Sequence, residues 1–325
     1  MQRRSFIAIG LGSILTLPGA ALASGRLHRG AALAFGTTVS VTVRHADEGV
    51  ARQAIDAALG AVAQVHRLMS IYDPASEVFR LNRDGVLPRP HPQLLEVLRH
   101  ARALSQLSRS AFDITVQPLW QTCARAAEHG AVPMPEERER ARLLAGWQDV
   151  EANHDRVVLR RPGMRITLNG LAQGFAADLA LRAVHRHGVT DALLDTGEFA
   201  VSGDAGDRPW MLGVPDPRAP AGTIAAFAPD GRCVATSGDY EAAFTADRRQ
   251  HHIFDPATGE SPPELSSVTV LAPTALEADG LSTTFMVMGA RRAHALAARM
   301  PGVDLLTIDK RGLAWRSSGF PGARS

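Results

Sequence analysis

Apolar residues recur along the chain with the two periods that distinguish helices from strands. Helical spacing predicts helices over residues 49–68, 92–108, 133–145, 174–187, 276–288 and 291–300. Runs of β-branched and apolar residues predict strands over 33–44, 157–160, 165–168, 192–195, 210–214, 223–228, 233–236, 268–271, 304–308 and 313–316. We expect 157–160 and 165–168 to form a hairpin, 69–82 a loop, and 112–120 a short segment that ends at a proline.

Helices and strands are intermixed without the strict alternation of a doubly wound sheet. The pattern therefore predicts an α+β fold with mixed or antiparallel sheets flanked by helices. No linker divides residues 24–325, which we expect to form a single globular domain. Neither a Gly-x-Gly-x-x-Gly fingerprint nor a Walker-type loop is present, so a nucleotide would need another mode of binding.

Residues 1–23 have the pattern of a signal peptide. Arg3 and Arg4 precede a mostly apolar stretch over 6–17, and the small residues Ala21 and Ala23 form a cleavage pattern. The paired arginines are typical of twin-arginine export, and an ordinary secretory signal is the alternative. We expect cleavage after Ala23, a periplasmic mature protein and no membrane span in the mature chain.

Composition narrows the range of partners. Hydrophobic residues make up 45% of the 325-residue chain, enough for a substantial core. The chain has 35 basic and 33 acidic residues, and removal of Arg3 and Arg4 with the signal leaves 33 of each. This balance gives no reason to expect a nucleic-acid partner. Cys123 and Cys233 lie far apart in sequence, so we favour unpaired thiols over the disulfide that export would permit.

Residues 278–284 lie at or near the start of an apolar helix. Asp279 and Thr283 are four residues apart and would share one helix face. A carboxylate and a hydroxyl on one face offer the hard oxygen ligands that Mg²⁺ prefers. The alternative is that Asp279 only stabilises the helix N-terminus.

Residues 166–178 have the pattern of a strand, a turn with Gly170 and Gly174, and a helix start. Free amides at such a helix start attract phosphate, and glycine lets a ligand approach the backbone closely. The alternative is a turn that only reverses the chain.

Residues 236–240 and 251–259 form a further candidate segment with adjacent His251 and His252. On a strand these side chains point to opposite faces, so they would not bind one metal ion together. We expect one histidine to face a ligand and the other to face solvent, with a turn from Asp255 onwards. A purely structural histidine is the alternative.

Taken in order, seven segments resemble the ApbE family of FAD:protein FMN transferases over nearly the whole mature chain. They are MSIYDPASEVFRLN, FDITVQPL, TLNGLAQGFAAD, LLDTGEFAVSGD, ATSGDY, HHIFDPATG and SVTVLAPTALEADGLSTTFMVMG. Both tyrosines of the chain lie in them, which suits a substrate with flat rings. The twin-arginine pattern and the TLNGLAQG variant are most similar to members associated with nitrous oxide reductase maturation and other exported respiratory systems.

The resemblance implies an ApbE-like fold and a Mg²⁺-dependent transferase that takes FAD as donor substrate. It implies that Mg²⁺ is held by the backbone oxygen of Ala172 and the side chains of Asp279 and Thr283. The implied FAD-binding residues are Met69, Tyr72, Asp113, Asn169, Gly170, Gln173, Asp178, Ser237, Gly238, Tyr240, His252, Ile253 and Asp255.

The implied reaction moves FMN to a threonine or serine hydroxyl of an acceptor flavoprotein in a respiratory or electron-transfer system, and AMP leaves. Such chemistry depends on charge neutralisation and positioning. Asp279 and His252 are the candidate catalytic residues, with His252 as the base. Two alternatives stay open: a Mg²⁺-dependent FAD pyrophosphatase and a non-catalytic flavin-binding chaperone.

The chain also departs from the usual family pattern, in which the turn reads roughly Asp-Leu-Gly-Gly-Ile-Ala-Lys-Gly. Thr167 replaces the acid, Asn169 replaces a glycine and Gln173 replaces the lysine. Glu198 stands where a second glycine is common. These changes leave the three implied metal ligands intact.

Overall fold

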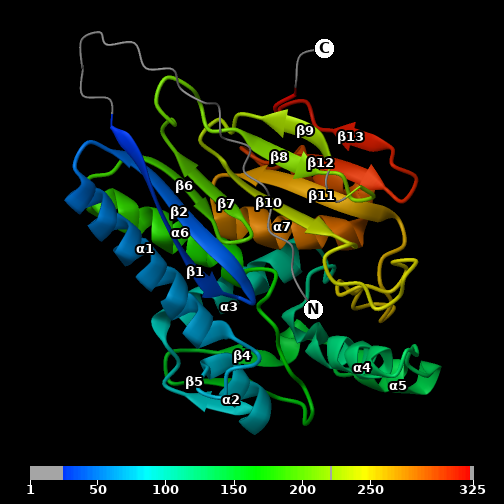
Figure 1. Cartoon of the computed structure of the whole chain (residues 1–325). Helices are drawn as coiled ribbons and strands as arrows, with labels where there is room; N and C mark the ends of the chain where they lie inside the picture. The colour runs from blue at the N-terminus through cyan, green and yellow to red at the C-terminus, as the bar shows by residue number, and fades with distance from the viewer. Residues whose placement is uncertain (1–24, 220–221, 323–325) are drawn as a thin grey trace.

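The computed structural model describes residues 25–219 and 222–322 (Figure 1). Within these ranges, eight strands form the main antiparallel sheet in the order β1-β2-β6-β7-β10-β11-β12-β13. They are β1 (Arg26–Ala34), β2 (Thr37–His45), β6 (Asp191–Asp195), β7 (Phe199–Ser202), β10 (Cys233–Gly238), β11 (Leu265–Ala272), β12 (Asp304–Asp309) and β13 (Ala314–Arg316). The predicted α+β class is confirmed, whereas the predicted signal peptide lies outside the described residues.

Helices pack on one face of this sheet around the largest apolar core. These helices are α1 (Glu48–Met69), α6 (Ala172–Arg186), α7 (Ala275–Met288) and α8 (Ala290–Ala297), and α3 (Pro92–Leu107) joins the same core by packing against α1 and α7. α6 packs against both α1 and α7, and α7 lies along β10 and β11. Figure 1 shows α6 and α7 next to each other behind the sheet. This arrangement brings the turn before α6 and the middle of α7 close to the end of β10.

A second apolar core lies on the opposite face, under the hairpin of β8 (Leu212–Pro215) and β9 (Thr223–Phe227). Successive residues of β10 serve the two cores, since Ala235 faces the helices and Val234 faces the hairpin. All of β11 is buried, as expected for a strand covered on both faces.

The remaining elements lie below the main sheet in Figure 1. The strands β3 (Val86–Pro88), β5 (Arg156–Leu159) and β4 (Val150–Ala152) form a small antiparallel sheet next to α2 (Glu77–Asp84). The others are the 3₁₀ helices η1 (Ile114–Val116) and η2 (Trp147–Asp149), with α4 (Gln117–Glu128) and α5 (Pro135–Arg142). A small apolar cluster joins α4 and α5 to the segment around Phe254.

Most of the predicted helices and strands are confirmed, but the strand expected over residues 33–44 is wrong. The chain forms two strands there, β1 and β2, which are joined by a tight turn. Phe35 and Gly36 both have positive φ in this turn, at 54° and 75°. A two-residue hairpin turn requires this backbone conformation, which the apolar pattern does not reveal.

Two expectations about loops are also wrong. Residues 69–82 are not all loop, because Ser76 caps α2 by accepting a hydrogen bond from the N–H of Val78. Residues 112–120 do not end at Pro118. This proline lies in the first turn of α4, where no backbone N–H is needed.

The hairpin expected from 157–160 and 165–168 is wrong, because β5 pairs with β3 and β4 instead. The Asn82 side chain accepts a hydrogen bond from the Ile166 N–H (2.7 Å) and donates one to the Ile166 carbonyl oxygen (2.8 Å). These bonds occupy backbone groups that a strand partner would need. The turn at Gly170 therefore follows an irregular segment rather than a strand.

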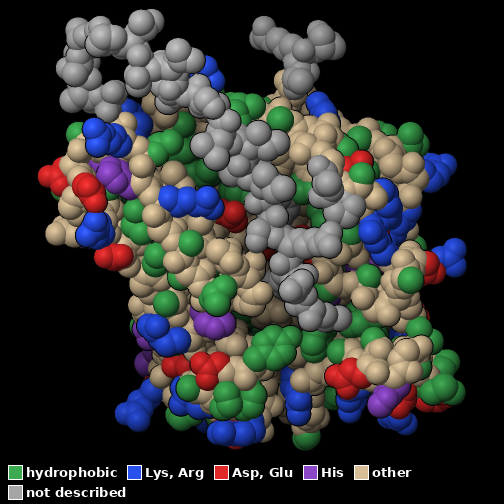
Figure 2. Space-filling model, in the orientation of Figure 1, with side chains coloured by type: hydrophobic (Ala, Val, Ile, Leu, Met, Phe, Trp, Pro, Cys, Tyr) green, Lys and Arg blue, Asp and Glu red, His purple; other side chains and the backbone are tan. Residues whose placement is uncertain are grey.

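The distribution of charged side chains and the state of the two cysteines match what the sequence predicts. Figure 2 shows basic and acidic side chains interspersed over the face that it presents. Cys123 and Cys233 are free and buried, as we favoured. Burial raises the pKa of the Cys123 thiol to about 11 and that of Cys233 to about 12. No helix within the described ranges is long and apolar enough to cross a membrane.

Candidate active site

The starts of α6 and α7 each receive a carboxylate from the other helix. Asp178 of α6 accepts hydrogen bonds from the N–H groups of Ala275 (2.8 Å) and Leu276 (3.0 Å), the first two residues of α7. Asp279 Oδ2 of α7 accepts a 2.9 Å hydrogen bond from the Gly174 N–H in the first turn of α6. Amides at a helix start need acceptors and carry partial positive charge, so both buried acids are stabilised there.

Glycine is required at position 174. A Cβ atom there would overlap the carbonyl oxygen of Ala275 and would lie 2.7 Å from the Cβ of Asp279. The two helices therefore approach each other through Gly174. This contact explains why Asp279 reaches the first turn of α6.

Thr283 lies one helical turn after Asp279 on α7, as the sequence predicts. Its Oγ1 would lie only 2.9 Å from a Cβ at Gly170, so a glycine lets the turn approach this hydroxyl closely. Ser237 Oγ, on β10, is 3.2 Å from Thr283 Oγ1 and 2.8 Å from Ser282 Oγ. The turn, α7 and the end of β10 thus meet at Thr283.

The oxygen donors at this junction fit Mg²⁺. Ala172 is the first residue of α6, two residues before the glycine that donates to Asp279. A carboxylate, a hydroxyl and a backbone carbonyl are all hard ligands. The described residues contain no group of three or more His, Cys, Asp or Glu side chains able to hold a metal ion. A metal here would therefore depend on Thr283 and Ala172 as well as on the carboxylate.

Two of the four residues that depart from the usual family pattern, Gln173 and Glu198, lie at one turn beside this junction. Gln173 Nε2 donates to the carbonyl oxygen of Thr196 (2.5 Å), and Thr196 Oγ1 donates back to the Gln173 carbonyl oxygen (2.9 Å). Glu198 Oε2 accepts a hydrogen bond from the Thr236 N–H (3.1 Å). Burial raises the pKa of Glu198 well above its ordinary value, and the nearby negative charge of Asp279 raises it further.

Two segments from the first half of the chain bind the backbone that leads into the Gly170 turn. Asn82 binds Ile166, as described above, and the Thr167 N–H donates to the Ile114 carbonyl oxygen (2.8 Å). Asn169 is exposed in this turn, and its N–H donates to Thr167 Oγ1 (3.3 Å). The sequence-predicted segments therefore converge here.

Asp113 lies just before η1 and is buried. Its Oδ1 accepts hydrogen bonds from the N–H (2.8 Å) and hydroxyl (2.5 Å) of Thr115, and its Oδ2 accepts one from the Trp147 N–H (3.0 Å). Burial raises the pKa of Asp113, and these hydrogen bonds oppose the rise. Both carboxylate oxygens of Asp113 thus bind backbone N–H groups, one at Thr115 and one at Trp147.

Met69 and Tyr72 lie in different surroundings. Met69 ends α1 and is buried in the main core, whereas Tyr72 is 67% exposed. The Tyr72 ring packs edge-on against Trp120, with 6.4 Å between ring centroids, and Trp120 packs in the same way against Phe244. Trp120 and Phe244 were missed from the sequence, because only the fold brings these distant aromatic residues into one row.

Tyr240 lies against the end of β10. Its ring occupies the space that a Cβ at Gly238 would fill, so this glycine is required for the contact. Burial raises the pKa of the Tyr240 phenol, which keeps the hydroxyl protonated.

The two histidines are not arranged as expected, because His251 is fully buried rather than exposed to solvent. The backbone of His251 pairs with Ala243 in an isolated β-bridge, and the His251 N–H donates to Ser261 Oγ (2.9 Å). The ring Nε2 lies 3.4 Å from the Pro262 carbonyl oxygen. Burial and the positive charge of Lys310 lower the pKa of His251 to about 4. The half-buried His252 donates its N–H to the Ala242 carbonyl oxygen (2.9 Å) and has Nδ1 3.3 Å from that oxygen.

Ile253 and Asp255 follow on the same segment. Ile253 is buried in the main core. Asp255 begins the predicted turn, which is confirmed: its Oδ1 accepts from the Ala257 N–H (2.9 Å), and its carbonyl oxygen accepts from the Gly259 N–H (2.8 Å).

Comparison with known proteins decides the family of this chain. The ApbE family model matches residues 35–307. The chain belongs to the ApbE family. It is 30% identical over 270 residues to the FAD:protein FMN transferase of Salmonella typhimurium, covering 78% of this chain and 77% of that protein. A Vibrio cholerae protein with the same name is 28% identical and covers 96% of this chain and 97% of its own length.

Solved ApbE structures share the fold. The ApbE protein of Thermotoga maritima is 30% identical, with a TM-score of 0.82 over 91% of this chain and 98% of its own. The apo form of the flavinyl transferase ApbE of Pseudomonas stutzeri is 28% identical, with a TM-score of 0.79 over 94% of this chain and 100% of its own. This membership makes the chain an enzyme of the transferase class, and the ApbE-like fold is confirmed.

Proposed function

We propose that this ApbE member is a Mg²⁺-dependent FAD:protein FMN transferase. The observation that supports this best is the junction of α6, α7 and β10. It gathers Gly170, Ser237, Asp279 and Thr283, four residues assigned to the site from sequence. The names of the relatives support FAD as the donor and a protein as the acceptor.

Asp279, Thr283 and the carbonyl of Ala172 would hold Mg²⁺, which when bound would neutralise charge on the FAD pyrophosphate. The Gly170 N–H has no hydrogen-bond partner among the described residues, so it can donate to a phosphate oxygen. The lack of a side chain at Gly170 keeps the approach to this amide open.

In the proposed reaction, the oxygen of a threonine or serine hydroxyl on the acceptor attacks the FMN-side phosphorus. The bond from this phosphorus to the bridging oxygen breaks, and AMP leaves with that oxygen. His252 would take the hydroxyl proton. A proton on its Nδ1 would be donated to the Ala242 carbonyl oxygen, which leaves the lone pair on Nε2 for this task.

We also propose that the protein acts in the periplasm, on an acceptor flavoprotein of a respiratory or electron-transfer system. The sequence pattern of residues 1–23 supports export. Cell fractionation of a strain producing the full-length chain would test the location, with Arg3 and Arg4 replaced by lysine as the matched variant. Accumulation of the variant in the cytoplasm supports twin-arginine export, and unchanged export contradicts it.

The activity is tested with mature protein, FAD, Mg²⁺ and a candidate acceptor domain. We expect covalent FMN on the acceptor, seen by in-gel fluorescence and mass spectrometry, with one AMP per FMN attached. Free FMN and AMP without labelled acceptor would replace the proposal with FAD hydrolysis. FAD binding without either product would replace it with a chaperone role.

A further inference from the structure

Asp239 is a fully buried acid that follows directly after β10, between Gly238 and Tyr240 of the site. Its N–H donates to the Ser266 carbonyl oxygen (2.9 Å), which extends the β10–β11 pairing by one residue. A buried carboxylate is costly unless it is paired and fully hydrogen-bonded.

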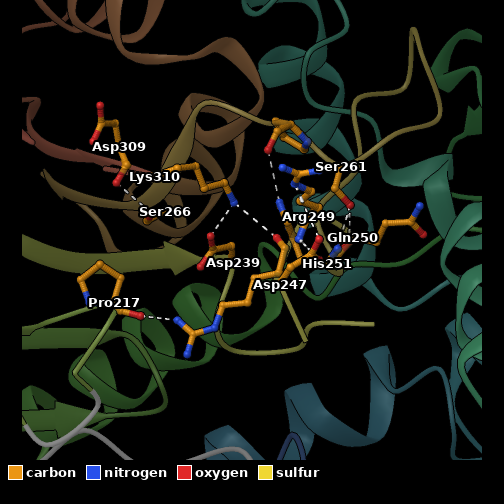
Figure 3. Close-up of polar contacts among 12 residues, drawn as sticks. Pro217, Asp239, Asp247, Arg249, Gln250, His251, Ser261, Ser266, Asp309 and Lys310 are labelled. Atoms are coloured by element: carbon orange, nitrogen blue, oxygen red, sulfur yellow. Dashed lines mark hydrogen bonds and ion pairs between the residues drawn. The ribbon is translucent and has the colours of Figure 1, made fainter. Parts of the chain in front are cut away.

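Two cations from distant parts of the chain pair with this carboxylate. Arg218, in the turn after β8, donates from its two terminal nitrogens to the two oxygens of Asp239, each at 3.0 Å. Lys310, in the turn after β12, donates to Asp239 Oδ2 at 2.5 Å. Figure 3 shows the Lys310 side chain reaching towards Asp239. Such a two-pronged Arg–carboxylate pair fixes geometry as well as charge.

The two turns that supply these cations also hold the loop after Asp239. Lys310 Nζ donates to the Arg248 carbonyl oxygen (3.4 Å), and the Arg248 guanidinium donates to the carbonyl oxygen of Pro217, next to Arg218. Arg248 has a positive φ of 58°, which is uncommon for a residue with a side chain and requires support from its surroundings.

This loop carries His252 at its far end. The Phe244 N–H donates to the Gln250 carbonyl oxygen (2.8 Å), and the His252 N–H donates to that of Ala242 (2.9 Å), so the loop closes on itself. Contacts at Arg248 therefore restrict the position of His252. Lys310 and Asp239 also lie close enough to His251 to shift its pKa in opposite directions.

We propose that Asp239, Arg218 and Lys310 form a positioning cluster that holds residues 240–252 and thereby orients His252 towards the acceptor hydroxyl. The proposal rests on the transferase function proposed above. Lys310 has the central part, because it contacts both the carboxylate and the loop. A cluster that only stabilised the fold would change unfolding without changing catalysis selectively.

The test removes the positive charge of Lys310 without disturbing the pair that Arg218 forms with Asp239. Lys310→Met keeps the length of the side chain and leaves Asp239 paired with Arg218. Arg311→Met is the matched control. It removes the same charge from the same turn, but the Arg311 side chain is 79% exposed. Lys310→Arg restores a cation at the position.

We expect Lys310→Met to lower kcat for FMN transfer about tenfold or more, with the KM for FAD changed less than twofold. Amide hydrogen exchange should become faster in residues 240–252 and stay unchanged in α6 and α7. Lys310→Arg should recover most of kcat, and Arg311→Met should behave as wild type. Unchanged exchange in the loop, or equal effects of Lys310→Met and Arg311→Met, would overturn the proposal.

Hydrogen exchange and FAD affinity keep this test separate from the proposed function. If the wild-type protein transfers no FMN to any acceptor, the transferase proposal fails. Faster exchange in residues 240–252 of Lys310→Met would then still show that the cluster holds the loop, and unchanged exchange would show that it does not.

Discussion

Asp178 caps the start of α7 and Asp279 caps the start of α6, so each helix depends on a carboxylate from the other. The proposed metal ligand is thus part of the packing between the two helices. Since α6 also packs against α1 and α7 lies along β10 and β11, this pair links the site to the main core.

Replacing Asp178 by alanine should destabilise the fold by about 2 kcal/mol, because two buried amides lose their acceptor. Urea unfolding followed by circular dichroism measures the loss. Asp47 caps α1 through two amides in the same way but is exposed, so Asp47→Ala should destabilise the fold less than Asp178→Ala and leave activity unchanged. Equal stability of Asp178→Ala and wild type would contradict the capping role.

Asp279 combines capping with the proposed metal binding, and two substitutions separate these roles. Asp279→Asn keeps an oxygen for the Gly174 N–H but loses the charge, whereas Asp279→Ala loses both. We expect both variants to lose Mg²⁺-dependent turnover of FAD by about 100-fold or more, and only Asp279→Ala to unfold at lower urea concentration. Mg²⁺ titrations by calorimetry and by activity check this expectation. Full activity of either variant rules out Asp279 as the metal carboxylate.

His252 and His251 should respond differently to substitution by alanine. Loss of a general base at His252 should lower kcat by about 100-fold with little change in FAD affinity. Loss of the fully buried His251 should instead lower the stability of the fold. Single-turnover rates and thermal unfolding distinguish the two outcomes. Unchanged single-turnover rates in His252→Ala would remove it as the base.

The sequence predicted α1 and α3 because burial of one face gives each an apolar period. It also predicted α6 and α7, although α7 is buried nearly all round. It also predicted the shared face of Asp279 and Thr283, which follows from helix geometry alone. It did not predict the hairpin turn at Phe35, or the loss of a strand at Ile166 to the side chain of Asn82. These depend on backbone conformation and on a contact across 84 positions of sequence. The burial of His251 likewise depends on how its loop closes.

Glu198 gives a prediction about stability and pH. Its folded pKa is raised above the ordinary value of 4.5, chiefly by burial, so the folded state binds a proton more tightly than the unfolded state. Stability should therefore fall as the pH rises from about 4.5 through the folded pKa. Each unit by which the folded pKa exceeds the unfolded pKa lowers the stability at high pH by about 1.4 kcal/mol.

The variant Glu198→Gln tests this expectation, because its amide oxygen still accepts from the Thr236 N–H and it has no proton to lose. Measured in EDTA, this variant should be more stable than wild type at pH 8 by about 1 kcal/mol or more and equal to it near pH 4. Glu48→Gln, at a position whose side chain is 71% exposed, should follow the wild-type pH dependence. A Glu198→Gln variant with that same dependence would mean that Glu198 is ionised in the folded protein at no cost.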